Sequence, residues 1–132
     1  MRAPCPCGEK KTYMQCCKQY LSGKHNAPTA VALMRSRFTA FSKHQSAYIV
    51  RTASGTAAAT LANQKNAICD ENIQWLRLEI QQIIRGEVDD TYGEVEFTAY
   101  YRDKHHPKQT HQLHEHSVFE KRGSQWFYTG AL

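Results

Sequence analysis

Apolar residues recur with two different spacings along this chain, and the change of spacing divides it into a helical half and a strand half. Between residues 29 and 44 they return every three to four positions, from Val31 to Phe41. That spacing places them on one face of an α-helix. A second short helix is expected over residues 46–52, and the Ala-rich segment 56–70 is compatible with a third.

From residue 71 onward the apolar positions alternate with polar ones, which is the period of a half-buried strand. The alternation is clearest over residues 76–80 and 95–101, and two further runs follow at 112–121 and 125–129. Short polar or glycine-containing segments separate these runs, as expected for reversals of the chain. Helices followed by consecutive antiparallel strands predict an α+β fold rather than an alternating parallel one.

The length and composition limit the fold and the compartment. The chain has 132 residues, of which 41% are hydrophobic and 22% charged, so it is expected to form one domain with a core of its own. A TIM barrel needs more residues than this. No apolar run reaches the roughly 18 residues that a membrane span requires, and no charged-then-apolar leader opens the sequence. We therefore expect a soluble, cytoplasmic protein without membrane insertion.

The positive charge is concentrated in residues 1–24. This segment contains one acid against five basic residues, so it carries +4 of the total +5: Glu9 against Arg2, Lys10, Lys11, Lys18 and Lys24. Such a patch favours an acidic protein surface or a phosphate backbone as partner. The segment is too short to bury an apolar core of its own, so something else must stabilise it.

The same segment contains four of the five cysteines, namely Cys5, Cys7, Cys16 and Cys17. Four thiolates are the ligand set of a closed tetrahedral zinc site, and the two close pairs can grip the ion from opposite sides. With every position filled by protein, the metal would be structural rather than catalytic. Iron also accepts four thiolates, so the spacing does not exclude it. The rival interpretation is a redox or disulfide cluster.

Residues 4–17, PCPCGEKKTYMQCC, resemble the SEC-C metal-binding motif, whose pattern is close to CPCGSGKKYKKCC. With LMRSRF at 33–38, EHSVF at 115–119 and WFY at 126–128, the whole chain resembles the YchJ-like (UPF0225) family. That resemblance implies an NTF2-like (cystatin-like) cone of helices packed on a curved antiparallel sheet. It also implies a division into a SEC-C motif at 1–24 and an NTF2-like α+β domain at 25–132.

The inside of the expected cone holds the second group of candidate residues. On the strand at 112–121, the alternation turns Leu113 and Phe119 to the core and places Glu115 and Ser117 on the same face. A buried carboxylate needs a partner, and Arg37, with Arg35 next, is the candidate. One interpretation is a structural ion pair. The other is a small-molecule or enzymatic pocket in which Glu115 binds a substrate or takes a proton; the expected lining is Arg35, Arg37, Glu115, Ser117, Trp126 and Tyr128.

Other conspicuous residues have simpler expected roles. The histidines near the third strand are expected to face solvent, with a weak secondary metal site as the alternative: His105, His106, His111, His114 and His116. Cys69 is expected to be a small buried residue. Trp75, Phe97 and Phe119 are expected in the core rather than as platforms for stacking bases.

Three functions remain open. The first is a non-enzymatic interaction module whose basic zinc knuckle docks an acidic protein surface through Lys10, Lys11 and Lys18. The resemblance supports it, because SEC-C motifs are similar to the tail of the preprotein translocase ATPase, which contacts an acidic chaperone. The second is the small-molecule or enzymatic pocket, although the sequence contains no complete catalytic constellation. The third is RNA or ribosome binding through the same basic segment; no motif for specific DNA binding is found.

Overall fold

A computed structural model describes residues 3–64 and 69–132 of the chain. Its helical part comprises a 3-10 turn and four helices: η1 (Tyr13–Gln15), α1 (Lys18–Leu21), α2 (Ala30–Ser42), α3 (Ser46–Arg51) and α4 (Gly55–Ala62). Its strands are β1 (Ile73–Arg85), β2 (Tyr92–Asp103), β3 (His111–Arg122) and β4 (Gln125–Ala131). The order of helices and strands is the one that the change of hydrophobic spacing predicted.

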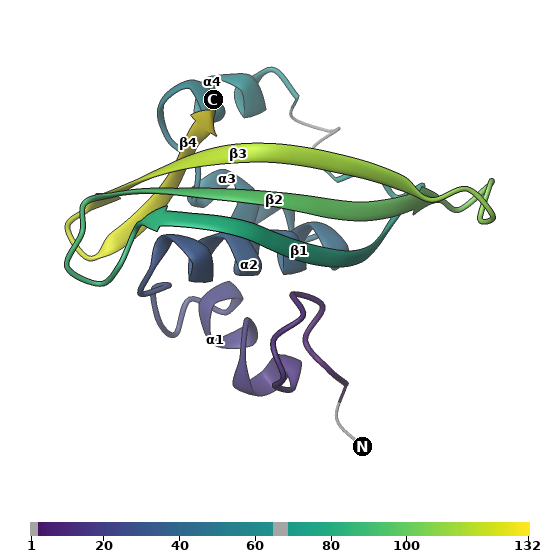
Figure 1. Cartoon of the computed structure of the whole chain (residues 1–132), viewed down its shortest axis with the longest axis horizontal. Helices are drawn as coiled ribbons and strands as arrows, with labels where there is room; N and C mark the ends of the chain where they lie inside the picture. The colour runs from purple at the N-terminus through teal and green to yellow at the C-terminus, as the bar shows by residue number, and fades with distance from the viewer. Residues whose placement is uncertain (1–2, 65–68) are drawn as a thin grey trace.

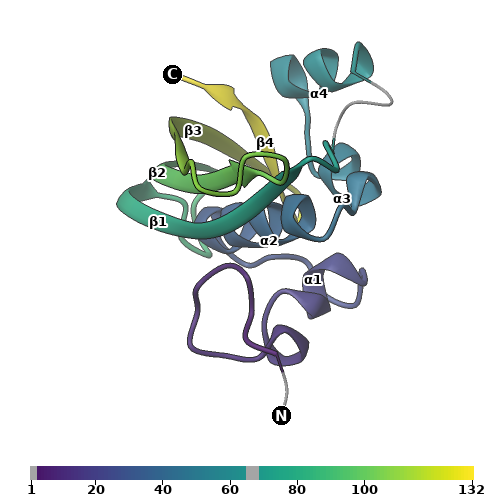
Figure 2. The same cartoon turned by 90° about the vertical axis from the view of Figure 1, so that its right-hand side faces the viewer.

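The four strands form one antiparallel sheet in which each strand pairs with the next along the chain. Register irregularities interrupt β1 twice and the β3–β4 pairing once, and such bulges bend a sheet. The resulting curved sheet is covered on one face by α2, which contacts β1, β2 and β4 (Figure 1). In Figure 2 α2 lies between the sheet and the N-terminal loops. The expected α+β architecture is confirmed.

Helix α2 begins where the sequence predicted and is attached to the sheet at its first residue. The side chain of Thr29 accepts a hydrogen bond from the amide of Ala32, which caps the helix. The Ala30 amide donates to the carbonyl of Gly86 at 2.9 Å. A Cβ on Gly86 would lie 2.6 Å from the Ala30 Cβ, so only glycine allows this close approach between the β1–β2 hairpin and the helix.

The Ala-rich segment forms a shorter helix than predicted. Helix α4 ends at Ala62 instead of continuing toward residue 70, with Asn63 at its C-cap. Ala57 is the one residue of α4 that is buried, so packing adds little beyond the intrinsic preference of alanine for a helix. Residues 65–68, which the prediction also included, lie outside the described residues.

The core of the cone lies between α2 and the inner face of the sheet. Leu33 and Phe38 of α2 pack in one buried cluster with Phe97 and Phe119, so both phenylalanines predicted for the core are there. Trp75 is half-buried at the margin of this cluster, with its ring centroid 5.9 Å from that of Phe38. No helix in the described part of the chain is long and apolar enough to cross a membrane.

Candidate metal centre and internal cavity

The first two cysteines lie on a tight N-terminal loop. The amide of Cys5 donates to the carbonyl of Lys11 at 3.0 Å, and the amide of Gly8 donates back to the carbonyl of Cys5 at 3.2 Å. Gly8 has a φ of +90°, a conformation that side chains other than glycine rarely adopt. These bonds turn the chain so that Cys5 and Cys7 both point toward the helical layer rather than into solvent.

The second pair is held by the short turns that follow. Cys16 is the C-cap of η1 and its amide donates to the carbonyl of Tyr13 at 3.1 Å, and Cys17 is the N-cap of α1. Adjacent residues cannot both point one way on an extended chain, but the change from η1 to α1 turns both thiols inward. The turn therefore places the thiols of both Cys16 and Cys17 beside those of the first loop.

The four sulfur atoms all lie within 4.8 Å of one another. The Sγ atoms of Cys7 and Cys16 are 3.6 Å apart, and those of Cys16 and Cys17 are 3.9 Å apart. A tetrahedral zinc with Zn–S bonds of about 2.3 Å requires sulfur–sulfur edges of about 3.8 Å. All four residues are buried, and none is paired in a disulfide. The cluster therefore has the number, chemistry and spacing of ligands that a closed metal site needs.

Thiols so close together do not ionise independently. Hydrogen bonds from Cys17 and Cys7 lower the pKa of Cys5, so the first negative charge is stabilised there. Donation to Cys5 raises the pKa of Cys17, and burial together with the charge on Cys7 raises the pKa of Cys16 to about 12. Like charges oppose complete ionisation, and a divalent cation removes this opposition.

One face of α2 supports the metal loop. Arg35 donates from Nη1 to the carbonyl of Cys7 at 2.6 Å, and its Nε lies 3.2 Å from the carboxylate of Glu9. One helical turn later, the Thr39 hydroxyl lies 3.8 Å from the Cys5 sulfur. Arg35 was predicted to line the pocket, and Thr39 was not among the predicted site residues. The i, i+4 spacing of these two residues was the signal that could have placed both on the metal side.

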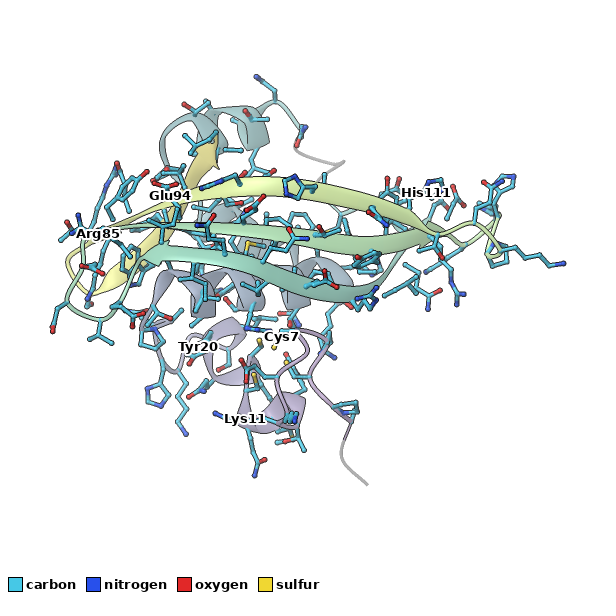
Figure 3. All side chains as sticks on the ribbon, in the orientation of Figure 1. Cys7, Lys11, Tyr20, Arg85, Glu94 and His111 are labelled. Carbon is cyan, nitrogen blue, oxygen red and sulfur yellow. The ribbon has the colours of Figure 1, made fainter. Side chains whose placement is uncertain are left out.

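The three lysines predicted to bind a partner are all exposed. Lys10 and Lys11 lie on the cysteine loop and Lys18 lies in α1. Glu9, the acid within the segment, is engaged by Arg35. Figure 3 shows Lys11 farther from the sheet than Cys7, on the outer side of the N-terminal loops. The segment therefore presents lysine ammonium groups outward around an inward-facing sulfur cluster.

The other candidate site is a cavity of about 420 Å³ between α2, α4 and the sheet. Its walls are mainly aromatic and aliphatic and include Phe38, Phe41, Trp75 and Phe97. Gln64 and Leu113, which also line it, are exposed, so the cavity opens to solvent on that side. This aromatic wall was not predicted from the sequence, because α2, β1 and β2 each contribute separate parts of it.

Three polar side chains on β3 and β4 meet at one end of the cavity. Glu115 accepts hydrogen bonds on Oε2 from the hydroxyl of Ser117 at 2.5 Å and from that of Tyr128 at 2.8 Å. Burial and the adjacent carboxylate raise the pKa of Tyr128, so its phenol stays protonated and acts as a donor. The structure thus brings together Glu115, Ser117 and Tyr128 as a polar wall in a mainly apolar cavity.

Arg37 also lines the cavity, but it does not form the ion pair with Glu115 that one interpretation of the sequence expected. Its Nη1 donates to the carbonyl of Ile49 at 2.9 Å and to the hydroxyl of Thr52 at 2.7 Å. Its guanidinium carbon lies 4.7 Å from the centroid of the Tyr128 ring, a cation–π contact. Burial lowers the pKa of Arg37 to about 10, so it remains charged at neutral pH.

Two other residues predicted for the pocket lie elsewhere. Arg35 and Arg37 are two positions apart, so about 200° of helical rotation separates them and they cannot line the same cavity. Trp126 is buried at the other end of the cone, where its indole nitrogen donates to the carbonyl of Pro28 at 3.2 Å. Leu113 shares the wall with Glu115 but is 42% exposed, because it lies at the opening rather than in the core.

The remaining candidate residues, the histidines near β3 and Cys69, belong neither to the cysteine cluster nor to the lining of the cavity. His114 and His116 lie on the outer face of the sheet, within 2.7 Å and 2.6 Å of Glu96 and Glu94 respectively. His105, His106 and His111 are exposed. Within residues 3–64 and 69–132, the cysteine cluster is the one group of three or more metal-ligating side chains close enough to share an ion. Cys69 is half-buried rather than buried as predicted.

The sequence is similar to known proteins along nearly its whole length. A family model described as "YchJ, middle NTF2-like domain" matches residues 29–131. A UPF0225 protein from Corynebacterium efficiens is 40% identical over 95% of this chain and 89% of its own length. A UPF0225 protein from Streptomyces coelicolor is 38% identical over 95% of this chain and 91% of its own.

Solved structures extend the similarity to the fold. A SEC-C motif containing protein from Rhodopseudomonas palustris, solved in solution, matches with a TM-score of 0.83 and 29% identity over 100% of this chain and 98% of its own. A crystal structure of a SEC-C motif containing protein from Psychrobacter arcticus matches with a TM-score of 0.73 and 25% identity over 98% and 80%. An NTF2-like domain preceded by a four-cysteine cluster therefore places this chain in the YchJ-like (UPF0225) family.

Proposed function

We propose that the four-cysteine cluster binds one structural zinc ion and that residues 3–24, called the knuckle below, act as a basic module for docking a protein partner. The observation that carries the metal assignment is the inward convergence of four buried sulfurs within 4.8 Å. All four positions of a tetrahedral ion are filled by protein, so no position remains for substrate or water. The ion would supply charge neutralisation and cross-linking, not chemistry.

Elemental analysis of freshly purified, reduced protein tests the metal. We expect about one zinc per chain, which is the stoichiometry of a single closed four-thiolate site. Iron bound in its place would give a coloured protein with visible absorption bands. Absence of both metals from a reduced sample supplied with zinc would contradict the proposal.

The charge of the knuckle supports docking to an acidic surface. Four thiolates and one zinc ion add −2 to a segment in which Lys10, Lys11, Lys18, Lys24 and Glu9 sum to +3, so the loaded knuckle keeps a formal charge of about +1. Lys10, Lys11 and Lys18 are exposed and carry that charge outward. Exposed charges of this kind act through long-range attraction, so binding should weaken as salt is added.

A charge-reversal variant tests this docking. We compare the zinc-loaded protein with a Lys10→Glu, Lys11→Glu, Lys18→Glu variant, and use Lys104→Glu, Lys108→Glu on the exposed β2–β3 hairpin as the matched control. A decaglutamate peptide should perturb NMR signals of the knuckle in wild type and in the control but not in the reversed variant. Tighter binding of a short oligouridine, with a steep salt dependence, would instead support the RNA-binding alternative.

The cavity favours a second candidate function, the binding of a small molecule inside the cone. A volume of about 420 Å³, apolar walls and a few convergent polar groups are typical of ligand sites. NMR titration with ethylbenzene, followed through the indole N–H signals, tests access, because Trp75 lines the cavity and Trp126 does not. We expect the Trp75 signal to shift and the Trp126 signal to stay. An unchanged Trp75 signal at saturation of the probe would contradict it.

A further inference from the structure

The Glu115 carboxylate uses only one of its two oxygens within the protein. Both hydroxyl donors, from Ser117 and Tyr128, point at Oε2. Among the described residues no hydrogen bond reaches Oε1, although a carboxylate oxygen accepts readily and the surroundings are apolar. Since Glu115 lines the cavity, this free oxygen is available to a group inside it.

The charges at this end of the cavity already balance. Glu115 contributes one negative charge, and Arg37 contributes one positive charge over the face of the Tyr128 ring, with its Cζ 4.7 Å from the ring centroid. Arg37 is directed elsewhere by its bonds to Ile49 and Thr52. A charged ligand would leave one unit of charge uncompensated in a site of low polarity, which is costly. A neutral ligand with a donor group avoids that cost.

The walls select the shape of the ligand. The rings of Phe38 and Trp75 meet edge to face, with centroids 5.9 Å apart and planes at 70°. Phe41 approaches Trp75 at 6.3 Å, and Phe97 lines the same space. Aromatic rings set at steep angles offer both faces and edges to a further flat ring.

We propose that the cavity recognises a small, uncharged aromatic molecule whose O–H or N–H group donates a hydrogen bond to Oε1 of Glu115. This inference rests on the second proposed function, that the cavity is a ligand site, and it adds the class of ligand. Glu115 selects ligands that have a hydrogen-bond donor, while the aromatic wall contributes affinity without distinguishing one apolar ring from another.

Three probes with one apolar body test the inference on the zinc-loaded full chain: 4-ethylphenol, 4-ethylanisole and 4-ethylbenzoate. The phenol has a donor, the anisole replaces it with a methyl ether, and the benzoate carries a negative charge. Followed through the Trp75 indole N–H, the phenol should bind about tenfold more tightly than the anisole, since a hydrogen bond to a charged group is worth about that ratio or more. The benzoate should bind most weakly.

Glu115→Gln identifies the residue responsible. Its amide presents N–H groups to the cavity in place of an anionic acceptor, so the advantage of the phenol should fall to less than about threefold. Glu96→Gln is the matched control, because Glu96 lies on the outer face of the sheet and its change should leave the ratio as in wild type. The probe comparison in the wild-type protein stands even if the Glu115 variant fails to fold.

The outcomes separate the two levels of the proposal. Equal binding of all three probes would overturn the role of Glu115 and leave the cavity as an unselective ligand site. Tightest binding of the benzoate would overturn it too, and would identify Arg37 as the recognising group. Failure of every probe to move the Trp75 signal would overturn both the inference and the ligand-binding function.

Discussion

In the knuckle the buried side chains are four cysteines and Leu21, whereas in the cone they are mainly aromatic and aliphatic. The cone can be stabilised by removal of apolar area from water, at roughly 25 cal/mol per Å². The knuckle buries too little apolar area for that, and four thiols facing one another offer little attraction without an ion. The two regions thus have different sources of stability, although both pack on α2.

Helix α2 connects these regions through its two sides. Arg35 and Thr39 contact the cysteine loop, and Arg37 and Phe38 line the cavity. The buried cluster continues from the cysteines through α2 into the sheet. The division of the chain at residues 24 and 25 therefore stays a prediction, which the following variants test from the largest expected effect to the smallest.

Cys16→Ser should separate the two regions most strongly. Removing one thiolate should abolish stoichiometric zinc binding, because the closed site needs all four ligands. Structural zinc contributes on the order of 10 kcal/mol to the folding of small domains, so the knuckle should lose its structure together with the metal. Signals of residues 3–24 should collapse in a ¹H–¹⁵N NMR spectrum while those of β2 and β3 stay dispersed. Cys69→Ser, outside the cluster, should keep the metal. Loss of dispersion throughout the Cys16→Ser spectrum would show that knuckle and cone form one cooperative unit.

Phe119→Ala should act on the cone. Phe119 is fully buried on β3, and removing such a ring lowers the free energy of unfolding by about 3–5 kcal/mol, through lost burial and the cavity left behind. Urea unfolding followed by far-UV circular dichroism measures this change, and zinc content in native buffer should stay near one per chain. A loss below about 1 kcal/mol would mean that the cone relaxes around the deletion.

Arg35→Ala should weaken the connection between the regions. It removes the hydrogen bond to the Cys7 carbonyl and the ion pair with Glu9, both of which orient the cysteine loop. Loss of such an outer contact lowers metal affinity by about tenfold or more. Competition with a chromophoric chelator measures the affinity, and Arg77→Ala, an exposed residue on β1, is the control. Equal affinities in the two variants would contradict a positioning role for Arg35.

Glu96→Gln should have the smallest effect. The pair between Glu96 and His114 lies on the outer face of the sheet, where His114 has a side chain that is 56% exposed. Exposed pairs of this kind contribute less than about 1 kcal/mol. The midpoint of urea unfolding and the zinc content should both stay at wild-type values. A clear loss of stability would show that the outer face matters to the cone more than its exposure indicates.

Much of the fold could be read from local patterns. The helical spacing before residue 45 and the alternation after residue 71 predicted α2 and the four strands, because a helix or strand face buried on one core must be apolar at its own period. The cysteine spacing predicted the cluster for a similar reason. Four thiols within 13 positions are confined by the length of the chain, so their meeting depends little on the rest of the fold.

The cavity needed the tertiary structure. Its residues come from α2, α4 and all four strands, and no local period relates Trp75 to Phe41 or Glu115 to Tyr128. Arg37 was expected to form an ion pair with Glu115, but its guanidinium instead donates to the Ile49 carbonyl in α3 and lies over the Tyr128 ring. Short-range spacing determines which face a side chain takes, whereas its partner depends on which distant elements pack against that face.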